Sequence, residues 1–215
     1  MLAGGRPSLQ LEVDGRQVEV ADEGQSLLAV LREGLGLRSP KDGCSPQGQC
    51  GCCTVLVDGQ PRVACVTPAR RVAGRAITTV DGLSDEVRDG WADAFAATGA
   101  SQCGFCTPGI ICRLEGLRTK DPDAPRPAVE QALLAHLCRC TGWRTILDAW
   151  DHQPRSASPE DRDATSAATR ARLEGGEPQA VGAAVALGRG GFADDTAPAD
   201  ALVAVPDGKG GWALG

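Results

Sequence analysis

The sequence predicts an α+β protein in which a small mixed-sheet region is followed by an all-helical region. Apolar residues alternate on both sides of two Asp-Gly turns, Asp14-Gly15 and Asp58-Gly59, which is typical of β-hairpins. After residue 82 the apolar spacing becomes that of helices. The ten cysteines also form two groups, one in each region. These observations predict three parts, with boundaries at 1–82, 83–152 and 153–215.

The first region is expected to form a small sheet wrapped around one helix. Ser26 can cap this helix, whose apolar residues precede a stop at Gly34 and Gly36. Each Asp-Gly turn joins two of the strands, and one more strand closes the region. The predicted strands are 9–13, 18–20, 54–57, 63–66 and 77–80.

The second region is expected to form four helices joined by short loops, which suggests a small bundle. Ser84 is a suitable N-cap for the first helix. Pro108 and Pro127 stand in the first turn of the second and third helices, where proline is favoured. The apolar faces of the last three helices are expected to carry Ile110, Ile111, Leu114 and Leu117, then Val129, Leu133 and Leu137, then Ile146, Leu147 and Trp150.

The third part differs from the other two in composition. Residues 153–180 are rich in Ala, Ser, Arg, Glu and Asp and have weak periodicity, so they are expected to be a linker or an extended arm. Residues 180–187 and 201–205 are apolar again, but they are too few to build a core. This arm is therefore expected either to pack on a partner subunit or to be disordered.

Composition excludes some classes of function. The formal charge is −6, the pI is about 5.0 and aromatic residues make up 3%, which argues against binding nucleic acid. No apolar stretch is long enough for a membrane span, and the first ten residues do not resemble an export signal. A cytoplasmic location is therefore expected, and there cysteines bind metals more often than they form disulfides.

The first cysteine group has the spacing C-x5-C-x2-C, formed by Cys44, Cys50 and Cys53, followed by Cys65. A plant-type [2Fe–2S] loop has C-x4-C-x2-C and a distant fourth cysteine. Glycines within the loop allow the backbone to curl around a cluster. Iron–sulfur is the favoured interpretation, while structural zinc and disulfides remain alternatives. Cys52 is surplus to the pattern and is expected to be a small packed residue.

The second cysteine group combines a CxxC, Cys103 and Cys106, at a helix N-terminus with a CxC, Cys138 and Cys140, between two helices. The positive end of a helix stabilises thiolates and an anionic cluster. Cys112 lies within the second helix and is expected in the core. His136 and His152 are the only histidines, and no nucleophile or nucleotide-binding motif is present in a suitable context, so no catalytic residue is expected on this chain.

The first loop with Cys65, together with QCGFCTPG and HLCRCTGW, resembles the iron–sulfur small subunit of the molybdenum hydroxylases, the xanthine oxidase family, over about residues 8–150. The resemblance implies a β-grasp, ferredoxin-like 2Fe-2S domain followed by an all-α four-helix 2Fe-2S domain. It implies one cluster on Cys44, Cys50, Cys53 and Cys65, and another on Cys103, Cys106, Cys138 and Cys140.

The resemblance also implies an electron-transfer role within a hetero-oligomer. Electrons would pass from a molybdopterin-containing large subunit, through both clusters, to FAD on a medium subunit or to another acceptor. The substrate chemistry, of xanthine, aldehyde, heteroaromatic or carbon monoxide dehydrogenase type, would then belong to the large subunit. A free-standing ferredoxin and a zinc-stabilised interaction module are the rival interpretations.

The sequence departs from the family pattern in several places. The first spacing has five residues where the family has four, and Cys52 stands where Ala or Ser is usual. Trp143 stands where the family often has Tyr. Residues 181–205 resemble the start of a molybdopterin large subunit, which would make the arm a piece of that subunit's surface.

Overall fold

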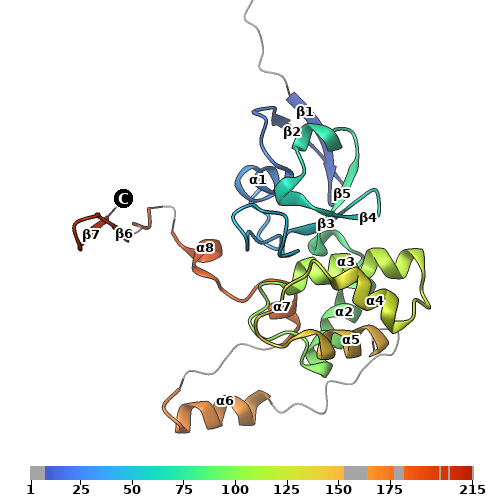
Figure 1. Cartoon of the computed structure of the whole chain (residues 1–215), viewed down its shortest axis with the longest axis vertical. Helices are drawn as coiled ribbons and strands as arrows, with labels where there is room; N and C mark the ends of the chain where they lie inside the picture. Colours follow the sequence, from blue (N-terminus) through green and yellow to red (C-terminus); the bar gives the residue numbers. More distant parts are fainter. Residues whose placement is uncertain (1–7, 153–163, 177–181, 199, 203, 215) are drawn as a thin grey trace, which may run out of the picture.

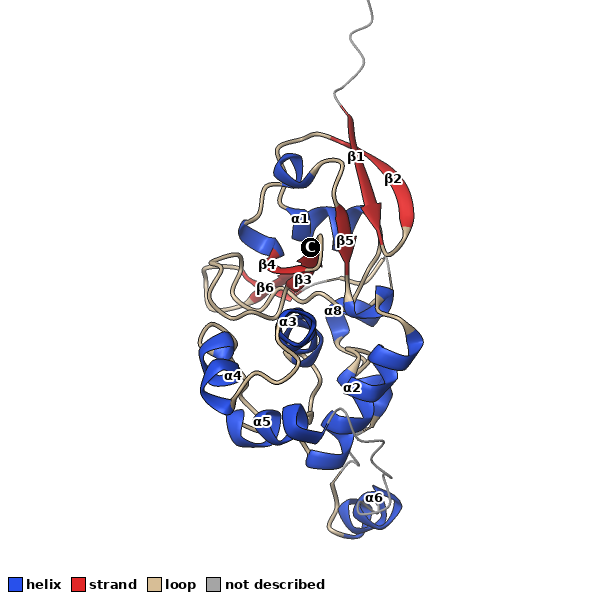
Figure 2. Ribbon diagram, turned by 90° about the vertical axis from the view of Figure 1, so that its right-hand side faces the viewer, coloured by secondary structure: helices blue, strands red, loops and turns tan. Residues whose placement is uncertain are grey.

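The computed structural model confirms a sheet region followed by a helical region (Figure 1). The two regions are stacked end to end, with helix α3 lying next to the sheet and α2, α4 and α5 beyond it (Figure 2). The structure describes residues 8–152, 164–176, 182–198, 200–202 and 204–214. The expectation of a linker therefore lies partly outside the described residues.

The sheet region is a mixed five-stranded sheet of the β-grasp kind. Its strand order is β2-β1-β5-β3-β4, in which β1 and β5 are parallel and the other neighbours are antiparallel. Alternate residues of β1 are buried, as the sequence pattern predicted. The strands are β1 (Ser8–Val13), β2 (Arg16–Ala21), β3 (Thr54–Val57), β4 (Gln60–Val63) and β5 (Ala76–Thr78).

Helix α1 (Leu27–Ala29) packs into the same core as the sheet and continues as a π-helical turn over Val30–Gly34. The Ser26 hydroxyl accepts a hydrogen bond from the Ala29 N–H at 3.2 Å, which confirms the expected cap. The buried side chains of α1 and the sheet share one core with Cys53 and Cys65. The sheet therefore forms one wall of the first cysteine group.

Two predicted strands were displaced. The Asp58-Gly59 turn pairs Val57 with Gln60, so β4 occupies 60–63, and 64–66 is a 3₁₀ turn instead of the predicted strand. The predicted strand 77–80 ends at Thr78 because the Asp14 carboxylate accepts hydrogen bonds from the Thr79 N–H and hydroxyl, at 2.7 and 2.9 Å. The Asp14 side chain thus takes the place of a neighbouring strand as the hydrogen-bond partner of Thr79.

The helical region contains α2 (Asp85–Thr98), α3 (Thr107–Lys120), α4 (Arg126–Leu133) and α5 (Trp143–His152). The four predicted helices are all present, and Cys112 is buried in their core as expected. Leu137 was wrongly placed on the third helix. Helix α4 ends at Leu133, and the Leu137 side chain is 57% exposed.

Part of the C-terminal arm packs on the chain itself. The side chains of Val185, Ala186 and Leu187 are buried, and α7 lies beside α2. Within the described residues, every helix is too short or too polar to span a lipid bilayer. The arm contains α6 (Ala164–Leu173), α7 (Ala183–Ala186), α8 (Ala193–Thr196), β6 (Ala204–Pro206) and β7 (Trp212–Leu214).

Candidate metal centres

The first cysteine group gathers at one end of the sheet. Cys44, Cys50 and Cys53 come from the loop between the π-helical turn and β3, and Cys65 comes from the 3₁₀ turn after β4. Within this group Cys44 lies beside Cys50 and Cys53 lies beside Cys65, close enough for each thiol to shift the pKa of its neighbour. Residues 64–66 form a 3₁₀ turn in place of the predicted strand, and this turn brings Cys65 next to Cys53.

Backbone N–H groups point at the sulfurs of this first group. The Gln47 N–H donates to Cys44 Sγ at 3.3 Å, and the Cys65 N–H donates to Cys53 Sγ at 3.4 Å. Burial alone would raise the pKa of the Cys44 thiol, but the N–H groups of Gln49, Gln47 and Cys50 lower it to about 6. The loop thus favours a thiolate at Cys44, the form that binds metal.

Cys52 is the fifth cysteine of this group and lies beside Cys50, whose thiol acts on its pKa. It is buried, and burial raises the pKa of its thiol. Its Sγ faces the backbone of Gly43, where an added Cβ would lie 3.2 Å from it and 3.1 Å from Cys50 Sγ. It also belongs to the core of the helical region, so it lies between the two cysteine groups.

The second cysteine group lies between the ends of helices. Cys103 and Cys106 precede and cap α3, while Cys138 and Cys140 lie in the turn between α4 and α5. The thiols again form two pairs, Cys106 with Cys138 and Cys103 with Cys140. Hydrogen bonds from the Cys106 thiol, and then from Thr141 and the Cys140 N–H, lower the pKa of the Cys138 thiol to about 4, although its burial opposes this.

The two groups are joined by hydrogen bonds between their loops. The Leu137 N–H donates to the Cys50 carbonyl oxygen at 3.0 Å, which links the residue before Cys138 to a cysteine of the first group. The Thr54 hydroxyl and His136 Nε2 are 3.1 Å apart, and Trp143 Nε1 donates to the His136 carbonyl at 3.0 Å. Burial, and then the charge of Arg113, lower the pKa of His136 to about 4, so it is neutral here.

Sequence reasoning missed this role of His136 as a bridge between the two regions. It fits because Gly51 has no side chain. Gly51 has φ +72°, and an added Cβ would lie 2.5 Å from the His136 ring. An added Cβ at Gly109, in the first turn of α3, would likewise lie 2.3 Å from the Gly51 carbonyl oxygen. Glycines within both cysteine motifs therefore mark the contact, although the sequence does not show which residues they touch.

A cavity of about 380 Å³ lies between the two cysteine groups. Its wall contains cysteines of both groups together with three apolar side chains. The lining residues are Gly43, Cys50, Cys52, Cys103, Phe105, Cys106, Leu137, Arg139, Cys140 and Phe192.

The donor sets fit [2Fe–2S] clusters. Each such cluster takes two protein ligands on each of two irons, and each site here presents four thiols as two pairs. A structural zinc ion takes four donors that converge on one point. Among the described residues, no three His, Cys, Asp or Glu side chains gather closely enough to hold a single ion.

Comparisons with known proteins agree with this chemistry. Residues 11–75 match the family model of a 2Fe-2S iron–sulfur cluster binding domain, and residues 79–151 match that of a [2Fe-2S] binding domain. The nicotine 6-hydroxylase small subunit of Paenarthrobacter nicotinovorans is 40% identical over 145 residues, which cover 67% of this chain and 87% of that protein. The nicotinate dehydrogenase small FeS subunit of Eubacterium barkeri is 37% identical, with 65% and 88% covered.

Solved structures share the fold. Quinoline 2-oxidoreductase from Pseudomonas putida 86 matches with a TM-score of 0.62 and 35% identity, covering 71% of this chain and 98% of that chain. Aldehyde oxidoreductase from Desulfovibrio gigas matches with a TM-score of 0.74 and 30% identity, covering 91% of this chain and 23% of that chain. The aldehyde oxidoreductase match covers 91% of this chain, whereas residues 1–152 make up less than three quarters of it. This match therefore extends into the C-terminal arm.

The chain therefore belongs to the small iron–sulfur subunits of the molybdenum hydroxylases, the xanthine oxidase family. Its two 2Fe-2S-binding domains serve electron transfer within such multi-subunit complexes.

Proposed function

We propose that this chain relays electrons from a molybdopterin-binding large subunit to FAD on a medium subunit or to another acceptor, through clusters held by eight of its cysteines. The ligands would be Cys44, Cys50, Cys53 and Cys65 in the ferredoxin-like domain, and Cys103, Cys106, Cys138 and Cys140 in the helical domain. When bound, each cluster would accept and release one electron. The observation that carries this proposal is that the four cysteines of each set come together from separate segments of the chain, within a domain that matches a 2Fe-2S-binding family.

The choice of Cys53 over Cys52 is supported by its contacts. The Cys53 thiol is paired with Cys65 and receives the Cys65 N–H, whereas Cys52 points to the region between the sites. The proposed domains are residues 1–82, residues 83–152 and an arm over 153–215. Separate cores around the sheet and around the helices support the first division.

The residues of this chain would hold and connect the two sites. The hydrogen bond from the Leu137 N–H to the Cys50 carbonyl fixes their separation and gives a short bonded route between them. Cys103 and Cys140 are exposed, which supports the helical site as the one facing the large subunit. We place the complex in the cytoplasm, where thiols stay reduced until metal binds them.

Purification of the tagged chain from its native host tests this proposal. The expected result is a brown complex that contains molybdenum, flavin, iron and acid-labile sulfide. A colourless preparation that contains zinc without sulfide would identify a zinc module instead. A brown chain that purifies alone, without molybdenum, would identify a free-standing ferredoxin.

A further inference from the structure

The C-terminal clasp, defined here as residues 182–196, returns to the iron–sulfur region and crosses the CxxC turn. An added Cβ at Gly104 would lie 2.1 Å from the Val185 carbonyl oxygen, and one at Gly190 would lie 2.8 Å from the Cys103 carbonyl oxygen. The clasp backbone thus lies directly on the residues next to Cys103 and Cys106. Its contact is tight enough to exclude side chains at both glycines.

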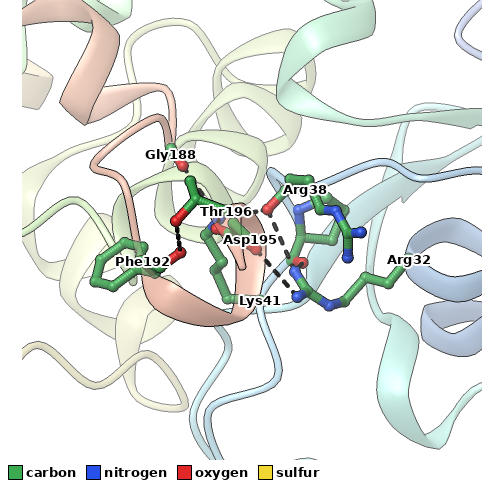
Figure 3. Close-up of polar contacts among 8 residues, drawn as sticks. Arg32, Arg38, Lys41, Gly188, Phe192, Asp195 and Thr196 are labelled. Carbon is green, nitrogen blue, oxygen red and sulfur yellow. Dashed lines mark hydrogen bonds and ion pairs between the residues drawn. The ribbon is translucent and has the colours of Figure 1, made fainter. Parts of the chain in front are cut away.

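A buried charge cluster fixes the clasp to the ferredoxin-like domain (Figure 3). Arg32 Nη2 lies 3.1 Å from Asp195 Oδ1, and Lys41 Nζ donates to the other carboxylate oxygen of Asp195 and to the Gly188 carbonyl. The side chains of Arg32, Lys41 and Asp195 are 5%, 2% and 8% exposed. Without the carboxylate, Arg32 and Lys41 would both lose this buried ion-pair partner, and the clasp would lose this anchor.

The charge cluster holds Phe192 at the cavity between the cysteine groups. The ring of Phe192 meets the ring of Phe105 edge to face, with centroids 5.1 Å apart, and Lys41 Nζ lies 5.4 Å from its centroid. Phe192 is the clasp residue that lines the 380 Å³ cavity. The wall of this cavity holds three proposed ligands of the helical site, Cys103, Cys106 and Cys140, and one of the other site, Cys50. Cys103 and Cys140 are exposed in this chain, so an apolar ring at this position covers part of the site from the chain's own side.

We propose that the clasp is a seal on the helical-domain cluster site, in which Phe192 covers the cavity and Asp195 locks it through Arg32 and Lys41. Phe192 and Asp195 are thus positioning residues, since neither is a ligand. The apolar shell around a metal site controls the access of water and the local dielectric. This inference rests on the proposed cysteine ligand sets.

The experiment measures how fast each cluster is lost. The complex containing the full chain is exposed to the iron chelator bathophenanthroline disulfonate, and the EPR signals of the two clusters are followed separately. The variants are Phe192→Ala, the conservative Phe192→Leu, and Asp195→Asn. Asp200→Asn is the matched control, because Asp200 lies just beyond the clasp and is exposed.

Phe192→Ala and Asp195→Asn are expected to speed the loss of the helical-domain signal about tenfold, which corresponds to about 1.4 kcal/mol. The ferredoxin-like signal should be lost at the wild-type rate, Phe192→Leu should fall between wild type and Phe192→Ala, and Asp200→Asn should match wild type. Unchanged rates would overturn the proposal. Equal acceleration of both signals, together with a lower melting temperature, would show general destabilisation and would also overturn it.

These outcomes are distinct from a failure of the proposed function. If the wild-type complex shows a single EPR signal, and Cys103 and Cys140 react with thiol reagents, then the ligand assignment itself is wrong. If the wild type shows two signals and the variants lose neither faster, only the seal is wrong.

Discussion

The two cysteine sites present the same number of paired thiols in different settings. In the ferredoxin-like site, three cysteines come from one loop and all but Cys44 are buried. In the helical site, the thiols come from two separate turns, and Cys103 and Cys140 are exposed. The geometry of the ferredoxin-like site is thus set mostly by the backbone of one loop. The geometry of the helical site depends on how α3, α4 and α5 pack. The difference suggests that the helical site is the more sensitive to changes elsewhere in the chain.

Removal of one proposed ligand should have the largest effect and should test whether the sites are independent. Cys140→Ser is expected to abolish the helical-domain EPR signal and leave the other, because a serine hydroxyl is a much weaker iron ligand than a cysteine thiolate. Cys112→Ala is the matched control, since Cys112 is buried in the core and belongs to neither set of pairs. Loss of both signals in Cys140→Ser would show that the sites do not assemble separately.

Removal of iron should separate the two regions by their stability. Metal binding contributes to folding free energy, and a cluster held by the CxxC and CxC thiols would tie these two turns together. The iron-free chain is therefore expected to lose much of its helical circular dichroism, with hydrogen exchange faster in 103–142 than in the sheet. An unchanged spectrum would show that the helical packing stands without the cluster.

A methyl group at the contact between the sites should have an intermediate effect. Gly51→Ala is expected to lower the free energy of unfolding by on the order of 3 kcal/mol, because it adds backbone strain and a clash with His136. Gly59→Ala is the control for strain alone, since Gly59 has φ +74° and nothing within 4 Å of an added Cβ. Denaturant unfolding should rank Gly51→Ala as clearly the more damaging. Equal values would leave strain as the whole explanation.

The smallest expected effect concerns one hydrogen bond between the sites. Thr54→Val removes the partner of His136 Nε2 within a buried contact, which should cost about 1–3 kcal/mol of unfolding free energy. Thr54→Ser keeps the hydroxyl and should lose less. The same denaturant experiment measures both, and a Thr54→Ser variant as unstable as Thr54→Val would assign the effect to packing.

The sequence alone determined the elements that depend on neighbouring residues. The Asp-Gly turns, the Ser26 cap, the four helices and the cysteine spacings follow short-range rules, and they led correctly to the fold class and the family. The predicted bounds were wrong where a backbone N–H bonds to a residue distant in sequence instead of continuing the local strand or helix. The strand after residue 76 ends early because of Asp14, and the third helix stops before Leu137, whose N–H bonds to Cys50.

Only the tertiary structure decided how the two sites and the arm meet. The contact between Thr54 and His136 spans 82 residues, and that between Arg32 and Asp195 spans 163. Such contacts leave no periodic pattern, because each involves a single residue from each segment. Their energy depends on burial and mutual geometry, which exist only after the chain has folded. The sequence therefore predicted two sets of metal-binding thiols, and the fold decided how the thiols of each set lie relative to one another and to the arm.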